Sequence, residues 1–288
     1  MTDKRGRADD WLPGEGDTFA GLELGPLLGE GGMGRVFRAI DAEGHVVALK
    51  VLRSEFSRDD GFRRRFEREA TAAARVDHPH VVRTFASGEA DGVLYLTQEF
   101  ISGGSVDETL ERAGVLELAR TVRICAEVAA GLDAMHAIGL VHRDIKPHNI
   151  MLDTADKAYV ADFGLAKDSK ASTVLTQMGQ AMGSLNYMAP EQIRGVEIDG
   201  RADVYALGCV TFQCLTGSAP FGDREGMRVM WAHLREEPPD VAAARPELPQ
   251  AVSWSIHKAL AKEPGDRPPT ATSFARMLQT ALPQEPAR

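Results

Sequence analysis

The stretch His142-Arg143-Asp144-Ile145-Lys146-Pro147-His148-Asn149 places an acid, an amine and an amide in one short loop, at positions 0, +2 and +5. Asp144 can accept a proton from a hydroxyl group, Lys146 can neutralise a phosphate during transfer, and Asn149 can hold a metal ion. Thirteen residues after Asn149, Asp162-Phe163-Gly164 supplies a second candidate metal ligand. Either motif alone could arise by chance, but their order and spacing together indicate phosphoryl-transfer chemistry.

The bulk properties are those of a soluble globular protein. The chain has 288 residues, 43% of them hydrophobic and 26% charged, which is enough for one large domain or for two lobes that share a cleft. Its net charge of −9 offers no basic excess to neutralise a nucleic-acid backbone, so no nucleic-acid partner is expected. Three scattered cysteines are too few for a disulfide framework or a zinc site, and we expect them to be buried, reduced thiols.

Hydropathy argues against a membrane span within this chain. No segment approaches the roughly 18 apolar residues that a spanning helix needs. The most apolar segment, Val204 to Leu215, is short and contains Gly208 and Gln213, so a buried helix is expected there. The N-terminus lacks an apolar signal core. We therefore expect a cytoplasmic location, either for a soluble protein or for the cytoplasmic part of a longer, membrane-anchored one.

The apolar pattern divides the chain into a strand-rich part and a helix-rich part. Residues 1–18 form a polar tail without periodicity, and residues 19–100 form the strand-rich part. The elements expected there are strands at 34–40, 45–52 and 93–100 and one helix at 61–76.

Ile101-Ser102-Gly103-Gly104 reads as a hinge, and helical patterns dominate from it to residue 281. Residues 282–288 form a second tail. The elements expected in this second part are helices at 105–113, 117–138, 201–216, 225–236, 250–262 and 271–281 and short strands at 150–152 and 158–161.

Gly29-Glu30-Gly31-Gly32-Met33-Gly34 fits the pattern G-x-G-x-x-G and is followed by Val36. A dinucleotide-binding fold is the rival interpretation, but it requires a helix directly after the glycines. Here residues 36–40 continue as a strand and then turn at Asp41 to Gly44. The motif therefore predicts a β-hairpin whose glycines let backbone N–H groups approach phosphates closely.

Lys50 closes the run Val46-Val47-Ala48-Leu49-Lys50. A lysine at a strand end is usually solvated, but Glu69 follows nineteen residues later on the expected helix. An ion pair between strand and helix would orient Lys50 toward nucleotide phosphates. Glu67, the nearest competitor, lies on another helical face from Phe62 and Phe66.

Three further motifs follow in order: Met188-Ala189-Pro190-Glu191, Asp203-Val204-Tyr205-Ala206-Leu207-Gly208 and Asp266-Arg267-Pro268. With these motifs the chain resembles a eukaryotic-type protein kinase over about residues 19–281. The resemblance implies an α+β, bilobal fold with a small β-rich N-lobe that contains one main helix and a larger, mostly helical C-lobe. Lys146 is typical of serine/threonine kinases. The amino acids within these motifs look most like those of the bacterial (Hanks-type) branch of the family.

The resemblance also implies roles for individual residues. Asp144 would orient the substrate hydroxyl and accept its proton, with Lys146 beside it, and Lys50, paired with Glu69, would hold the α- and β-phosphates. Asn149 and Asp162 would hold Mg²⁺ or Mn²⁺. The implied ATP-binding residues are Leu28, Gly29, Gly31, Gly34, Val36, Ala48, Lys50, Glu99, Ile101 and Met151.

Four more positions take their expected roles from family position alone. Gln98 falls at the gatekeeper position, and Ser184 stands where serine/threonine kinases usually have threonine, so that its hydroxyl can bridge Asp144 and Lys146. Glu191 is expected to pair with Arg267, and Asp203 is expected to hydrogen-bond the backbone of the catalytic loop.

The loop from Asp162 to Glu191 is hydroxyl-rich and is expected to be a phosphorylation switch. Thr176, seven residues before Gly183, is the first candidate for autophosphorylation, with Thr173 and Ser172 as alternatives. The expected partners are ATP, proteins with serine or threonine hydroxyls, and a second copy of the chain for autophosphorylation in trans.

Two other functions stay open from the sequence. One is a pseudokinase, in which the same fold serves as a binding or scaffold module; Lys50, Asp144 and Asp162 argue against it because such proteins typically lose these residues. The other is a kinase for small molecules, which usually lacks a well-formed Ala-Pro-Glu segment of the kind at Ala189 to Glu191.

Overall fold

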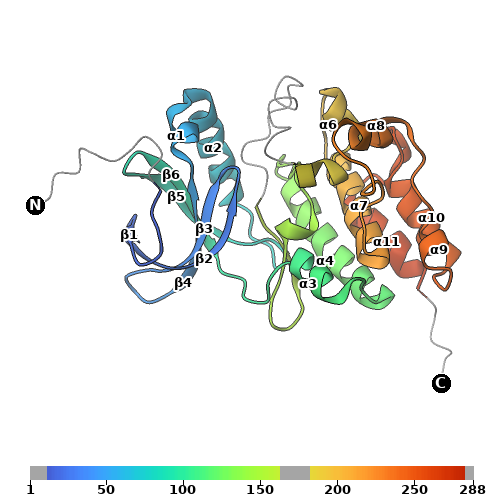
Figure 1. Cartoon of the computed structure of the whole chain (residues 1–288), viewed down its shortest axis with the longest axis horizontal. Coiled ribbons are helices and arrows are strands. Elements are labelled where there is room, and N and C mark those ends of the chain that lie inside the picture. Colours follow the sequence, from blue (N-terminus) through green and yellow to red (C-terminus); the bar gives the residue numbers. More distant parts are fainter. Residues whose placement is uncertain (1–11, 163–181, 283–288) are drawn as a thin grey trace, which may run out of the picture. The chain divides into compact units, whose positions relative to one another are not determined.

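The computed structural model describes residues 12–162 and 182–282. The described residues divide into two compact units. The first consists of the residues up to Asp77 together with Val82–Ile101, and the second of His78–Val81 together with the residues from Ser102 onward. Figure 1 shows most strands in the first unit and most helices in the second.

A six-stranded antiparallel sheet forms the first unit, in the order β1-β2-β3-β4-β6-β5. Its strands are β1 (Thr18–Phe19), β2 (Leu22–Gly31), β3 (Gly34–Ile40), β4 (Val46–Leu52), β5 (Thr84–Ala90) and β6 (Val93–Glu99). β3 has the expected bounds. β4 ends at the expected Leu52 and begins one residue after the expected His45; Val51 and Leu52, which follow Lys50, are both buried and extend the apolar pattern.

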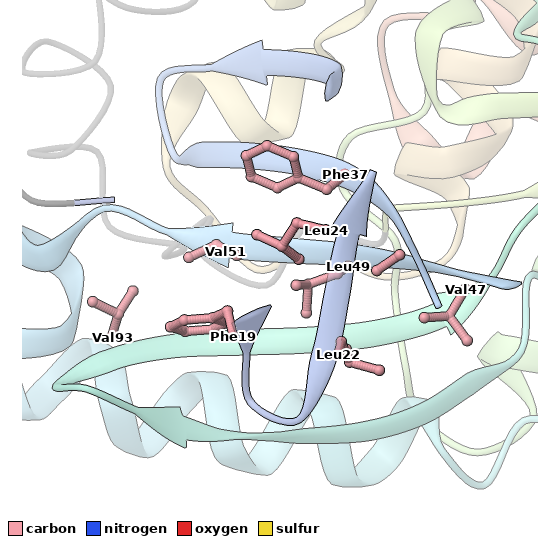
Figure 2. Packing of buried hydrophobic residues seen from close by; sticks show 9 residues of the cluster. Phe19, Leu22, Leu24, Phe37, Val47, Leu49, Val51 and Val93 are labelled. Carbon is pink, nitrogen blue, oxygen red and sulfur yellow. The ribbon is translucent and has the colours of Figure 1, made fainter. Parts of the chain in front are cut away.

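One face of this sheet carries the apolar core of the unit. Alternate residues of β4 point inward, as a strand with period two requires. Their side chains meet those of the neighbouring strands in a cluster of aromatic and aliphatic groups (Figure 2). The cluster consists of Phe19, Leu22, Leu24, Phe37, Ala39, Val47, Leu49, Val51 and Val93.

Two helices belong to the first unit, α1 (Ser54–Arg58) and α2 (Asp60–Ala73). The Asp59 side chain accepts a hydrogen bond from the Phe62 amide at 2.8 Å and so caps α2. Phe62, Phe66, Ala70 and Ala73 form the buried stripe, as the helical spacing predicts. α2 ends three residues before the expected Val76, and α1 was not expected because only one of its five residues is buried.

The second unit is mostly helical, with one small hairpin. Its elements are α3 (Val106–Ala113), α4 (Leu118–His136), η1 (Pro147–Asn149), β7 (Ile150–Leu152), β8 (Ala158–Val160), η3 (Met182–Tyr187), α6 (Pro190–Arg194), α7 (Arg201–Thr216), α8 (Met227–Arg235), α9 (Val241–Ala244), α10 (Gln250–Ala259), η4 (Pro264–Asp266) and α11 (Ala271–Thr280). The fold class is α+β, as the sequence predicts.

α7 forms the centre of this unit. Nearly all of its residues are buried, because α4, α10 and α11 pack around it. A helix that is apolar on all sides is stable only when protein or lipid surrounds it, and here protein does so. The apolar segment from Val204 to Leu215 is therefore the buried helix that the sequence predicts. Among the described residues, no helix combines the length and the apolar character that crossing a bilayer requires.

α4 and α11 are joined by an unusual cap. Both carboxylate oxygens of Asp133, near the end of α4, accept hydrogen bonds from the first amides of α11, those of Ala271 and Thr272, at 3.0 Å each. These amides have no partner within their own helix, and the negative charge faces the positive end of its dipole. The contact fixes the C-terminal helix onto the helix that leads into the catalytic loop.

Candidate active site

The glycine-rich segment forms the end of β2 and the turn into β3, as a β-hairpin. A Cβ atom at Gly34 would lie 1.9 Å from the Val51 carbonyl oxygen, so packing of β3 on β4 demands glycine there. At Gly29 and Gly31 an added Cβ would meet no heavy atom within 4 Å. Packing therefore does not explain these two glycines, whereas an uncovered backbone that phosphates can approach does.

Lys50 lies in β4, opposite Val36 of β3 and Leu96 of β6. Glu69 lies on α2 of the same unit, with its side chain largely buried, whereas Glu67 is exposed, in agreement with the expected helical faces. The ion pair between Lys50 and Glu69 stays a prediction.

Gln98 is buried in β6, with 6% of its surface exposed, and is paired in register with Ala48. Among the described residues its amide nitrogen has no hydrogen-bond partner. The next residue is Glu99, and its amide donates to the Arg83 carbonyl at 2.8 Å. The Glu99 amide is therefore already used within the protein, and the contact of the Glu99 backbone with a purine and the gatekeeper role of Gln98 stay predictions.

In the second unit, Asp203 holds the backbone of the catalytic loop. This residue of α7 is 1% exposed. Its Oδ2 accepts hydrogen bonds from the His142 amide at 2.8 Å and from Nε2 of His136 at 2.7 Å, and its Oδ1 accepts one from the Arg143 amide at 2.8 Å. The structural role expected for Asp203 is confirmed. His136 is an addition, and nothing in the sequence around it signals that it joins this cluster.

Asp203 and His136 each stabilise the charged form of the other. Burial disfavours the charged form of Asp203, but the hydrogen bond and charge of His136 outweigh burial and hold the pKa of Asp203 below its ordinary value. Burial likewise opposes protonation of His136, but the hydrogen bond to Asp203 and the nearby carboxylates raise its pKa. Asp203 therefore stays an anion that can accept the three hydrogen bonds.

His142 supports the loop as a neutral ring, because complete burial lowers its pKa. Its Nε2 donates to the Ala161 carbonyl at 2.9 Å, and its Nδ1 accepts the Asp144 amide at 3.2 Å. One imidazole thus connects the loop that carries Asp144 with the strand end that leads to Asp162.

Asp144, Lys146 and Asn149 lie together, as their spacing predicts. Nζ of Lys146 is 3.2 Å from Oδ2 of Asp144. The Asn149 amide nitrogen donates to the Asp144 carbonyl at 2.8 Å and to Oδ2 of Asp144 at 3.2 Å. Because the amide nitrogen is used in this way, the side-chain oxygen of Asn149 is the atom that a metal ion can take.

The β7–β8 hairpin places Asn149 and Asp162 at the same end. β7 begins directly after Asn149, β8 ends two residues before Asp162, and Ile150 pairs with Val160. The Ala161 amide donates to the Asn149 carbonyl at 2.9 Å. Amide and carboxylate oxygens brought together at one hairpin end suit Mg²⁺ or Mn²⁺, so the residues present fit the metal that the sequence implies.

The other end of this hairpin is fastened to α4. Arg120 and Arg123 both form ion pairs with the Asp156 carboxylate, and Glu127 accepts the Ala158 amide at 2.7 Å. These contacts, which the sequence did not reveal, fix the turn and the second strand of the hairpin whose first strand carries Met151. Met151 is half-buried in β7, and its place against adenine stays a prediction.

Glu191 and Arg267 form the expected ion pair, and both are buried. The guanidinium binds the carboxylate with two parallel hydrogen bonds of 2.6 and 2.7 Å. Its remaining three N–H groups donate to the carbonyls of Ala261, Arg201 and Lys262. The pair anchors α6 to the helical core.

Several predicted residues are not tested by this geometry. Thr176, Thr173 and Ser172 lie outside the described residues. Ser184 belongs to η3, but its side chain also lies outside the described part of the chain. The ATP contacts expected of Leu28, Gly29, Gly31, Gly34, Val36, Ala48, Lys50, Glu99, Ile101 and Met151 stay predictions.

Comparison with known proteins identifies the family of the chain. The family model for the protein kinase domain matches residues 22–280. The serine/threonine-protein kinase PknD of Mycobacterium tuberculosis is 42% identical over 275 residues, which cover 95% of this chain and 41% of that protein. PknE of Mycobacterium bovis is 41% identical over 270 residues, which cover 93% of this chain and 47% of that protein. The chain thus spans less than half the length of these relatives.

Solved structures give the same answer for the fold. The crystal structure of the Mycobacterium tuberculosis PknI kinase domain, C20A mutant, matches with a TM-score of 0.77 and 32% identity, covering 94% of this chain and 99% of that one. The two-lobed kinase fold and the bacterial serine/threonine branch expected from the sequence are confirmed. The chain belongs to the protein kinase domain family, and the bacterial relatives that it matches are serine/threonine-protein kinases.

Proposed function

We propose that this chain transfers the γ-phosphoryl group of ATP to serine or threonine hydroxyls of proteins, with Mg²⁺ or Mn²⁺ as cofactor. The observation that carries the proposal is the cluster of Asp144, Lys146 and Asn149, in which Nζ of Lys146 and the amide nitrogen of Asn149 each lie 3.2 Å from Oδ2 of Asp144. The reaction forms a bond between the substrate oxygen and phosphorus and breaks the bond between phosphorus and the β–γ bridging oxygen, so that ADP leaves.

Each residue has a defined task in this reaction. Asp144 orients the substrate hydroxyl and takes its proton late in the transfer, and Lys146 offers positive charge to the phosphoryl oxygens. Asn149 and Asp162 would hold the metal ion, which when bound neutralises charge on the phosphate oxygens. Lys50 and the glycine turn would bind the phosphates. Positioning and charge stabilisation therefore supply most of the catalysis.

We also propose that the enzyme phosphorylates itself between Asp162 and Glu191, with Thr176 as first site and a second copy as substrate. Arg143, next to Asp144, is the proposed partner of the new phosphate, because guanidinium and phosphate form paired hydrogen bonds. The need for ATP and three buried, free cysteines fit a reducing cytoplasm.

The test is incubation of the purified chain with γ-labelled ATP, Mg²⁺ and a protein mixture, followed by separation of labelled protein from labelled metabolites. We expect label on serine and threonine of proteins, and its loss when a chelator removes the metal. Labelled metabolite without labelled protein would instead indicate a small-molecule kinase. Tight ATP binding without turnover would indicate a scaffold module, and either result would refute the proposal.

A further inference from the structure

The residue before the proposed base has a backbone conformation that needs support from its surroundings. Arg143 has a φ angle of 65°, in the left-handed region that residues with a side chain adopt only at a cost in free energy. Asp144 is attached directly to the peptide group that follows. Any relaxation of Arg143 would therefore rotate this peptide and move the Asp144 carboxylate.

The peptide group between Arg143 and Asp144 is held at both of its polar atoms. Its N–H, from Asp144, donates to Nδ1 of His142 at 3.2 Å. Its carbonyl, from Arg143, accepts a hydrogen bond from Nε2 of Gln192 at 3.0 Å. Gln192 is thus a side chain from outside the loop that holds the peptide from which Asp144 projects.

The side-chain oxygen of Gln192 fixes the orientation of the Gln192 amide group. Its Oε1 accepts the Ala189 amide at 3.0 Å, at the N-terminus of α6. With the oxygen committed to that amide, the nitrogen faces Arg143. A glutamate in this place could accept from Ala189 but could not donate to a carbonyl.

Gln192 lies on α6, a helix that is anchored to the rest of the unit. The preceding residue, Glu191, is buried and bound by Arg267 through two hydrogen bonds. Gln192 therefore extends from an anchored helix to a strained turn. The same helix ends the segment in which we propose that phosphorylation occurs.

We infer that Gln192 is a positioning residue for Asp144. It acts through the Arg143 carbonyl and connects the loop at 142–149 to the end of the proposed phosphorylation loop, Asp162 to Glu191. The inference rests on the proposed function for its effect on rate. Its effect on the loop backbone is independent of any activity.

Gln192→Glu is the sharpest test because it keeps the acceptor for Ala189 and replaces the donor for Arg143 with a charged acceptor. Gln192→Asn is a second variant, too short by one methylene to span both contacts. Gln279→Glu, on an exposed position of α11, controls for the added charge. For each protein we would measure kcat, KM for ATP, the melting temperature, and hydrogen exchange of peptides covering 142–146 and 189–194.

We expect Gln192→Glu to lower kcat about 10- to 100-fold, with KM for ATP and melting temperature close to wild type. Exchange should rise in 142–146 and stay unchanged in 189–194. Gln192→Asn should lower kcat as well, and Gln279→Glu should change nothing. An unchanged kcat with unchanged exchange in both Gln192 variants would overturn the inference, as would a fall in kcat that only tracks a lower melting temperature.

The exchange measurement separates the two proposals. If the wild-type chain transfers no phosphoryl group, the proposed function fails, yet faster exchange in 142–146 of Gln192→Glu would still support the structural link. If the wild type is active but neither rate nor exchange responds to Gln192, the positioning role alone is wrong. If Gln192→Glu does not fold, kcat and hydrogen exchange of 142–146 in Gln192→Asn test the positioning role instead.

Discussion

Arg267→Met should strongly destabilise the second unit. Arg267 uses all five of its N–H groups, two on Glu191 and three on backbone carbonyls. Methionine fills a similar volume but donates nothing. The change therefore leaves a buried carboxylate without its counter-charge and three carbonyls without their donor.

The expected loss follows from burial of the pair. Removing one partner of a buried, hydrogen-bonded ion pair costs about 3–5 kcal/mol in free energy of unfolding. For a unit of this size that corresponds to a fall in melting temperature of about 6–20 °C. Helical circular dichroism during heating is the assay, because most helices belong to the second unit.

Two further variants show whether the loss of stability in Arg267→Met comes from the buried ion pair. Arg194→Met breaks the exposed pair with Glu263 and should cost no more than about 1 kcal/mol. Glu191→Leu combined with Arg267→Met removes both charges and should recover part of the loss. If Arg267→Met costs no more than Arg194→Met, the reasoning that this pair anchors α6 is refuted.

Three other predictions follow from the sites described above. Gln98→Ala should sensitise the enzyme to purine analogues with bulky substituents; an inhibition profile equal to wild type would show that Gln98 is no gatekeeper. Phosphatase treatment should lower the rate of wild type, and Thr176→Ala should start at that lower rate; if neither happens, the switch does not run through this residue. Because the pKa of His136 is raised in the folded state, its pairing with Asp203 stabilises the fold fully below the unfolded value near 6.5 and progressively less as pH rises through the raised value. His136→Gln should therefore cost more free energy of unfolding at pH 6 than at pH 9, as urea titrations can measure, and an equal cost at both would contradict the assignment.

The local parts of this molecule could be predicted from the sequence. The period-two pattern gives β3 its bounds, and the run from Val204 to Leu215 predicts a buried helix. α1 was not predicted because a five-residue helix with one buried residue shows no helical period of apolar residues. β4, in contrast, ends at the expected Leu52, because the apolar residues after Lys50 are part of the same core.

In the site, contacts between residues close in sequence could be predicted, and contacts between distant residues could not be predicted from spacing. The cluster of Asp144, Lys146 and Asn149 is local in sequence, so spacing predicts it. The pair of Glu191 and Arg267, 76 residues apart, was expected only because of the family resemblance. His136 and Gln192 carry no motif of their own. Their partners are 67 and 49 residues away, and only the folded backbone brings them together.

The rate of phosphoryl transfer by Asp144→Asn tests the central claim most directly. Asparagine keeps the shape of the side chain, and the backbone stays held by Asp203 and His142, so the melting temperature should not change. Asp223→Asn, at an exposed carboxylate, is the matched control. The account predicts a rate about 10²- to 10⁴-fold below wild type for Asp144→Asn and a wild-type rate for the control. A rate near wild type for Asp144→Asn at equal thermal stability would contradict it.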